Sequence, residues 1–232
     1  MTAAEDPAAP RRLGAARPQP GSTDSAWRAP CQGPPCLGPV PLAGQDATVT
    51  PPLETARLLL QPLALEDAAQ VQAIFPRWEI VRHMTALVPW PYPPDGALAF
   101  YRDVALPAVA RGEAWHWTLR LRNDREVIIG AISLQRAGEQ RGFWVGLPWQ
   151  GKGFAGEACD AVTAYWFEVL RMPSLRVEKA AANEASRRIS LRQGMRLVGT
   201  SERDFVGGRL PAETWELDAE TWRARRALDP QP

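Results

Sequence analysis

The sequence is poor in the residues that many catalytic and metal sites require. Its 232 residues include two histidines, His83 and His116, and three cysteines, Cys31, Cys36 and Cys159. Cys31 and Cys36 could pair or contribute to a metal site, but no second Cys or His cluster completes a tetrahedral ligand set. We therefore predict no metal site. Cys159 lies on the apolar side of a helical pattern, so we expect a buried structural thiol there.

Net charge and long apolar runs are also almost absent. The 27 basic and 26 acidic residues leave a formal charge of +1, so charge gives no reason to expect nucleic acid or an anionic membrane as a partner. No run of about 18 apolar residues predicts a membrane span, and the N-terminus lacks the apolar region of a signal peptide. We expect a cytoplasmic protein with no nucleic-acid and no membrane partner.

Composition divides the chain into one folded domain and two flanking segments. Residues 1–50 contain nine prolines and no hydrophobic period, so they cannot bury enough apolar area to offset the entropy of ordering. We expect a disordered extension over residues 1–52, a folded domain over 53–220 and a polar tail over 221–232. The domain is long enough to bury a sizeable core.

Hydrophobic periodicity within the domain predicts a mixed α/β fold. Helical spacing covers residues 66–75, 95–111, 154–169 and 183–193. Strand-like segments cover 55–63, 114–121, 127–134, 140–147, 176–181, 196–205 and 214–217. The three strands between the second and third helices follow one another closely, which predicts an antiparallel meander.

The segment Gln150–Gly156 is the most informative part of the chain. It contains three glycines, two of them directly before the helical pattern that begins at Phe154 and the third in its first turn. The first amide N–H groups of a helix have no partner within the helix and carry the positive end of its dipole. A loop with few side chains leading into such amides therefore predicts a binding site for a phosphate group.

Three phosphate-binding patterns compete for this segment. A Walker loop requires Gly-x-x-x-x-Gly-Lys-Ser/Thr, and that spacing is absent. Gly151–Gly156 matches the dinucleotide fingerprint Gly-x-Gly-x-x-Gly literally, but that fingerprint belongs in a parallel βαβ unit, so a nicotinamide-dependent oxidoreductase rests on this match alone. The third pattern, Gln/Arg-x-x-Gly-x-Gly/Ala, fits Gln150–Ala155 position by position.

Further short motifs accompany this third pattern in order along the chain. They are Thr55–Leu60, Trp90–Tyr92, Ile129–Ile132, Gly142–Val145, Asn183–Ser186 and Gln193–Met195. With them the chain resembles the GNAT superfamily of acetyl-CoA-dependent N-acetyltransferases, in its RimJ/RimL-like branch, over roughly residues 55–218. The resemblance implies a GNAT-type, mostly antiparallel central sheet flanked by helices. It also implies acetyl-CoA as co-substrate, no metal, and a monomer or homodimer.

The resemblance implies that an amine attacks the thioester directly in a ternary complex, and the absence of a Ser-His-Asp or Cys-His arrangement agrees with this. The acceptor is a primary amine, either a peptide N-terminus or a small molecule. The rival hypothesis is a CoA-binding sensor or partner domain without catalysis.

The resemblance also assigns roles to individual residues. Backbone N–H groups hold the pyrophosphate along Gln150, Gly151, Lys152, Gly153, Phe154, Ala155 and Gly156. The edge formed by Phe143, Trp144 and Val145 pairs with pantetheine amides, and one of its N–H groups polarises the thioester carbonyl. Asn183 bonds the pantetheine arm and Ser186 donates to the departing thiolate. The alternative is that Asn183 only caps a helix and that Ser186 occupies its N3 position.

The general base and the acceptor pocket are assigned from position alone. Asp204 lies on the strand after the last predicted helix, where some relatives carry an acidic residue, and Glu79 and Glu113 are alternatives. Trp90 and Tyr92 are expected to form a wall of the acceptor pocket, although aromatic packing in a proline-rich loop would look the same.

Overall fold

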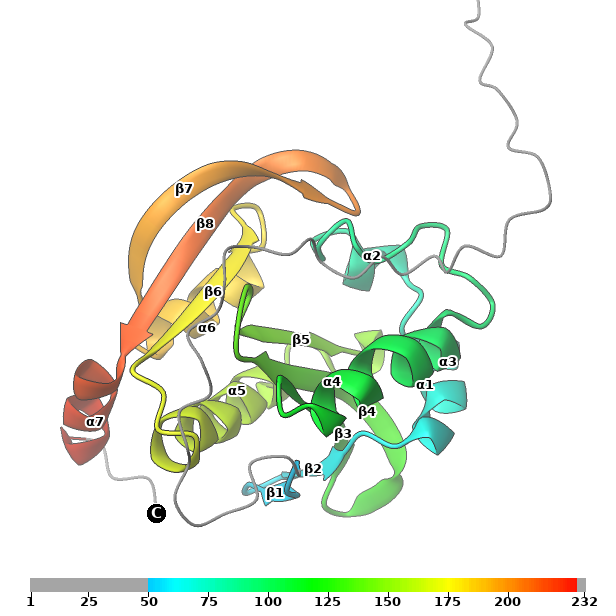
Figure 1. The fold of residues 1–232 in the computed structure, drawn as a ribbon, viewed down its shortest axis with the longest axis horizontal. Coiled ribbons are helices and arrows are strands. Elements are labelled where there is room, and N and C mark those ends of the chain that lie inside the picture. Colours follow the sequence, from blue (N-terminus) through cyan, green and yellow to red (C-terminus); the bar gives the residue numbers. More distant parts are fainter. Residues whose placement is uncertain (1–49, 229–232) are drawn as a thin grey trace, which may run out of the picture.

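The computed structural model describes residues 50–228. Cys31, Cys36 and nearly all of the predicted disordered extension lie outside these residues. The described chain forms two antiparallel sheets, with helices against both faces of the larger one (Figure 1). The predicted class, a mostly antiparallel α/β fold flanked by helices, is confirmed.

The larger sheet has five strands in the order β1-β2-β3-β4-β5. Its strands are β1 (Leu53–Glu54), β2 (Leu58–Pro62), β3 (Ala114–Leu121), β4 (Asp124–Gln135) and β5 (Arg141–Val145). The meander β3-β4-β5 is the one predicted from the sequence, and β3 has the predicted bounds. Because β5 is last in the order, one of its edges has no strand partner among the described residues.

The smaller sheet has the order β6-β8-β7. Its strands are β6 (Ser174–Ala180), β7 (Arg196–Phe205) and β8 (Gly208–Asp218). The two sheets touch where the Gln140 N–H donates to the Arg176 carbonyl at 3.2 Å and the Arg176 N–H donates to Gln140 Oε1 at 2.6 Å. Beyond that point β5 and β6 do not pair, so the single sheet expected from the sequence is divided in two.

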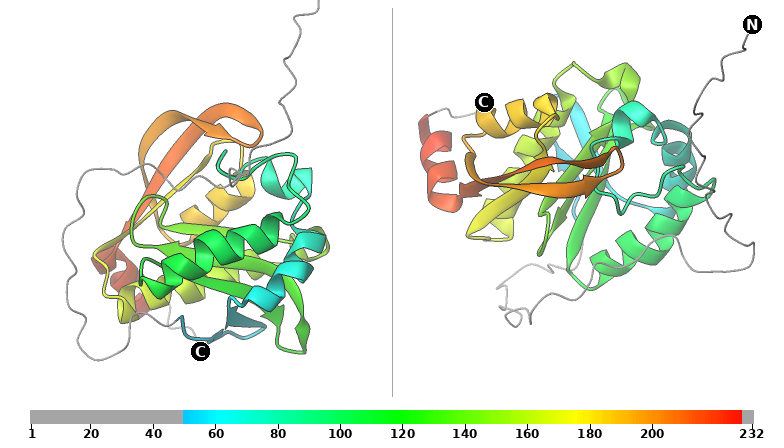
Figure 2. Two further views of the ribbon diagram at one scale, coloured as in Figure 1. Left: turned by 45° about the vertical axis from the view of Figure 1, so that its right-hand side comes forward. Right: turned by 90° about the horizontal axis from the view of Figure 1, so that it is seen from above.

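Helices cover both faces of the five-stranded sheet (Figure 2). One face carries η1 (Leu65–Asp67), α1 (Ala68–Ile74), and the continuous helical segment α3 (Gly96–Phe100), η2 (Tyr101–Ala105) and α4 (Leu106–Ala110). The opposite face carries α5 (Phe154–Ala164), which continues as η4 (Tyr165–Val169). The remaining helical elements are α2 (Trp78–Val81), η3 (Leu147–Trp149), α6 (Glu184–Arg192) and α7 (Ala219–Leu228).

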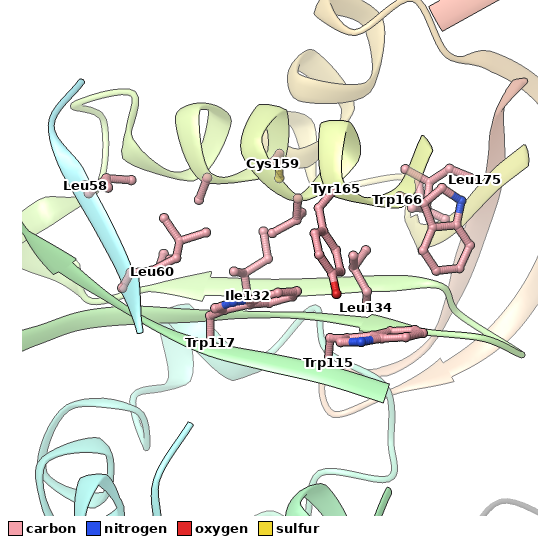
Figure 3. Close-up of a cluster of buried hydrophobic side chains, with 14 of the residues drawn as sticks. Leu58, Leu60, Trp115, Trp117, Ile132, Leu134, Cys159, Tyr165, Trp166 and Leu175 are labelled. Carbon is pink, nitrogen blue, oxygen red and sulfur yellow. The ribbon is translucent and has the colours of Figure 1, made fainter. Parts of the chain in front are cut away.

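The main core lies between the sheet and α5 (Figure 3). The alternating pattern of β3 directs Trp115 and Trp117 toward this face, and both are fully buried. Tyr165 meets both indole rings edge-on, with centroids 6.3 and 5.7 Å away. Cys159 is fully buried in the same cluster, as predicted.

Two helices were not predicted from the sequence. Helix α2 has only four residues and follows a proline, so it shows no period. Helix α7 occupies residues that we expected to be a polar tail, and it has no buried residue. Trp222 attaches α7 to the domain, with its ring centroid 5.2 Å from that of Phe167.

Candidate functional site

The glycine loop ends in an uncapped helix start. Gly151 and Gly153 have φ angles of +75° and +85°, a region that favours glycine because other residues meet steric cost there. Gly153 is the N-cap of α5 and no side chain caps this helix. The first amide N–H groups of α5 therefore have no side-chain partner, and a ligand can accept hydrogen bonds from them without displacing a protein group.

Glu157, one turn into α5, fixes the loop to the start of β2. Its carboxylate accepts hydrogen bonds from Thr55 Oγ1, from the Arg57 N–H at 2.8 Å and from Arg57 Nε at 2.7 Å. Arg57 Nη1 in turn donates to the Lys152 carbonyl at 3.0 Å. Burial alone would raise the pKa of Glu157, but the hydrogen bonds from Thr55 and Arg57 outweigh it and lower the pKa. The loop is thus held by a carboxylate that stays ionised.

Gly156 has a packing reason of its own. A Cβ built there would lie 2.5 Å from Arg192 Nη2, so the Arg192 guanidinium occupies the space that a side chain would fill. Asp160 holds this guanidinium at 2.9 Å. A cation from α6 therefore lies beside the first turn of α5, where it adds to the positive end of the helix dipole.

The free edge of β5 presents its own amides. The Gly146 N–H donates to the Ile129 carbonyl of β4 at 2.8 Å. Successive residues of a strand point their N–H groups in opposite directions, so those of Val145 and Phe143 point away from β4. The Val145 carbonyl is already bonded on that side by Gln150 Nε2 at 2.8 Å.

Helix α6 begins opposite this edge. Asn183 caps it, and its Oδ1 accepts the Ser186 N–H at 3.2 Å. The Asn183 NH₂ group and the Ser186 hydroxyl form no hydrogen bond with any described residue. Buried Lys179 donates to the Ser186 carbonyl at 3.1 Å and to Ser190 Oγ. Burial and then Arg141 lower the pKa of Lys179 to about 7.

Two neighbouring spaces lie between these elements. A groove of about 660 Å³ is bounded by the β5 edge, the glycine loop and α6. A cavity of about 350 Å³ lies between the sheet, α1, α2 and η2. We call them the groove and the acceptor cavity. The residues that line both are Ile80, His83, Phe143, Trp144, Asn183 and Ser186, so the two spaces meet at the β5 edge and the start of α6.

Most of the predicted site residues come together in the groove. Its lining includes Phe143, Trp144, Val145, Gln150, Gly151, Gly153, Phe154, Ala155, Gly156, Asn183 and Ser186. Lys152 contributes its carbonyl to the Arg57 bond but does not line the groove. Tyr92 lines the acceptor cavity, whereas Trp90 packs on Trp78 with centroids 5.6 Å apart and lines neither space.

The structure does not support Asp204 as the general base. Its side chain is 69% exposed, lies 3.9 Å from Arg209 and lines neither space. The reason is the long β7–β8 hairpin, which carries Asp204 near its tip (Figure 1). Glu113 pairs with Arg111 and is also outside, whereas Glu79 lines the groove.

His83 is the site residue that sequence reasoning missed. Among the described residues it is the only titratable side chain that lines both spaces. Burial and then Arg82 lower its pKa below the ordinary value of 6.5, so the imidazole is neutral and able to accept a proton at neutral pH. The only sequence feature that could have pointed to His83 is the rarity of histidine, since the chain has two.

A family model described as an acetyltransferase (GNAT) domain matches residues 57–196. This chain belongs to the GNAT acetyltransferase family, and so to a class of acyltransferases. No curated protein matches the sequence.

Solved structures share the fold at low sequence identity. RimL, a ribosomal L7/L12 α-N-protein acetyltransferase in complex with coenzyme A, has a TM-score of 0.64 at 13% identity, covering 74% of this chain and 99% of RimL. The microcin C7 self-immunity acetyltransferase MccE, in complex with acetyl-CoA and AMP, has 0.61 at 16%, covering 71% and 93%. A GNAT-family acetyltransferase from Bacillus anthracis has 0.61 at 16%, covering 73% and 99%. These similarities concern the fold.

Two further observations apply to residues 50–228. They contain no group of three or more His, Cys, Asp or Glu side chains placed to hold a metal ion. None of their helices is long and apolar enough to cross a membrane.

Proposed function

We propose that this protein transfers the acetyl group of acetyl-CoA to a primary amine, with both substrates bound at once. The observation that carries this proposal is the junction of the groove and the acceptor cavity at Phe143, Trp144, Asn183 and Ser186. An extended donor in the groove and an amine in the cavity would meet there. Direct transfer then needs no nucleophile from the protein.

The glycine loop suits the pyrophosphate of acetyl-CoA. A Cβ on Gly153 would point at Arg57 Nη2 from 3.3 Å, and the bare backbone leaves the first amides of α5 accessible. These amides and the Arg192 guanidinium together would bind two adjacent phosphates. Acetyl-CoA supplies an acetyl group already activated as a thioester.

The β5 edge suits the pantetheine arm. The N–H groups of Phe143 and Val145 point away from β4. They can therefore donate hydrogen bonds to an extended ligand, in the way that they would to a neighbouring β-strand. An N–H donor beside the thioester carbonyl also stabilises negative charge that develops on its oxygen. The unbonded NH₂ group of Asn183 would reach the arm from the opposite wall.

Ser186 and His83 would handle the protons. The unbonded Ser186 hydroxyl would donate a hydrogen bond to the departing thiolate. A buried negative charge without such a partner would be energetically unfavourable. Neutral His83 would take a proton from the substrate ammonium, directly or through a water, and so leave the free amine that attacks the thioester carbonyl. Because His83 lines both the groove and the acceptor cavity, we propose it as the base instead of Asp204.

A thiol-release assay with a panel of amines tests the function. We expect release of CoA that depends on the amine, and loss of the acid limb of the kcat/KM profile in His83→Gln, because that limb reports protonation of the base below pH 6.5. Acetyl-CoA binding by calorimetry without turnover on any amine would contradict catalysis and favour the sensor hypothesis.

A further inference from the structure

The acceptor cavity has one apolar side. Its lining there includes Val71, Phe75, Ile80, Met84, Val88 and Val104, contributed by α1, α2, η2 and the loop after α2. Most of these residues belong to the second hydrophobic cluster of the domain or pack against it. At about 350 Å³, the cavity is near the lower end of the usual range for ligand pockets, ~300–1,000 Å³. It therefore suits a compact group.

The titratable side chains on this side carry no charge at neutral pH. Burial lowers the pKa of His116 to about 4. Burial and then the Asp95 carboxylate raise the pKa of Tyr92 far above neutrality. An apolar group placed here would meet no fixed charge that it must desolvate.

The opposite side of the cavity is acidic. Glu139 and Glu178 both line it. Glu178 is paired with Arg203 at 3.0 Å, whereas Glu139 forms no ion pair with a described residue. Desolvation by the surrounding protein and then Glu178 raise the pKa of Glu139 to about 7, so this carboxyl is partly ionised at neutral pH. Of the two carboxyls in the lining, Glu139 is therefore the one that an ammonium group could pair with.

Two cations, Arg141 and Lys179, also line the cavity. Arg141 is 3% exposed and donates to Thr163 and Gln193 at 2.7 and 2.8 Å. Lys179 is 5% exposed and holds the first turns of α6 through the Ser186 carbonyl. Lys179 is thus occupied by α6, whereas the partners of Arg141 are neutral and its Nε has no hydrogen-bond partner among the described residues.

We propose that the acceptor is a primary amine on a compact apolar body. The inference rests on the proposed function and names its substrate class. A cationic head would lie toward Glu139 and the junction, and the apolar body would fill the space among Val71, Ile80 and Val104. The same chemistry is found in a free alkylamine or arylalkylamine and in a peptide whose first residue is apolar.

A homologous series of amines tests this on the wild-type protein. From n-propylamine to n-hexylamine, kcat/KM should rise about fourfold for each methylene group until the cavity is filled, since each buried methylene contributes about 0.8 kcal/mol. 2-Phenylethylamine should exceed ethanolamine and spermidine, and Phe-Gly-Gly should exceed Ser-Gly-Gly. Comparison of kcat/KM for the best amine and the best peptide then shows whether the acceptor is a free amine or a peptide N-terminus.

Two variants locate the effect. Val104→Trp should lower kcat/KM for n-hexylamine at least tenfold and change that for n-propylamine less than twofold. Val109→Trp, on the same helical segment but outside the lining, should leave the series unchanged. Glu139→Gln should lower kcat/KM about two- to fivefold at every chain length, as for a partly exposed charge.

The outcomes separate the two proposals. Acetyl transfer with a flat series, or with a preference for spermidine, would overturn this inference and leave the proposed function intact. No transfer to any amine or peptide would overturn the proposed function itself.

Discussion

Replacing Gly153 with valine tests whether the glycine loop binds a phosphate group. Gly153 has a φ of +85° and is the N-cap of α5. A side chain at positive φ costs about 1–2 kcal/mol, and a β-branched one is the least tolerant. Its Cβ would also lie 3.3 Å from Arg57 Nη2, next to the hydrogen bond that Arg57 makes to the loop.

This strain is smaller than the ~5–15 kcal/mol stability of an ordinary domain, so Gly153→Val should remain folded. The branched side chain would block approach to the first amides of α5. Loss of one or two charge-assisted hydrogen bonds, each worth about 1.5–3 kcal/mol, corresponds to a fall in acetyl-CoA affinity of at least tenfold. Titration calorimetry measures that affinity, and urea unfolding measures the stability.

Gly208→Val is the matched control. Gly208 has a φ of +111°, lies at the β7–β8 turn and has open space where a Cβ would be. It should lose a similar free energy of unfolding and keep full affinity. Unchanged affinity in Gly153→Val, or equal losses in both variants, would refute the phosphate role of the loop.

Three further predictions concern Ser186, Glu157 and His116. Ser186→Ala should lower kcat about tenfold with little change in the acetyl-CoA KM, because the hydroxyl acts on the leaving group; an unchanged kcat would leave Ser186 only its place in the first turn of α6. Glu157→Ala should reduce the free energy of unfolding by about 1–2 kcal/mol and weaken acetyl-CoA binding, since it frees Arg57 and Thr55; full affinity by calorimetry would show that the loop holds its shape unaided. His116 has a folded pKa of about 4, so between pH 6.5 and 4 the unfolded state binds more protons and stability falls as pH falls, by up to about 3 kcal/mol. Urea unfolding at pH 7 and 4.5 should show a smaller fall in His116→Phe, and equal falls would contradict the assignment.

Local sequence was sufficient to predict an element of the fold where its pattern is compatible with only one structure. The alternation of Trp115, Trp117 and Leu119 defines β3, because one face of that strand must be buried. Asn183 and Gly194 delimit α6 through cap chemistry, and Gly194 has the expected positive φ of +77°. The glycine loop could likewise be predicted from its own residues.

What the sequence could not supply depends on distant contacts. The position of Asp204 depends on contacts between segments that are far apart in the sequence: the Ala86 N–H donates to the Asp204 carbonyl at 3.1 Å, and the Val206 N–H donates to the Met84 carbonyl at 2.9 Å. His83 reaches the junction because Ile80 and Val81 of α2 pack into the second cluster, a tertiary event without periodicity. The divergence of β5 from β6 likewise arises from how the two sheets pack. The sequence of either strand alone does not indicate that it lies at the edge of a sheet.

The unpaired edge of β5 has a consequence for solubility. An exposed strand edge invites pairing with a strand of another molecule and so promotes aggregation. Here α6 and the glycine loop stand across the groove from Phe143 and Val145, so an incoming β-strand, with side chains on both faces, would collide with them. To pair with β5, a strand of another molecule would therefore have to enter the groove.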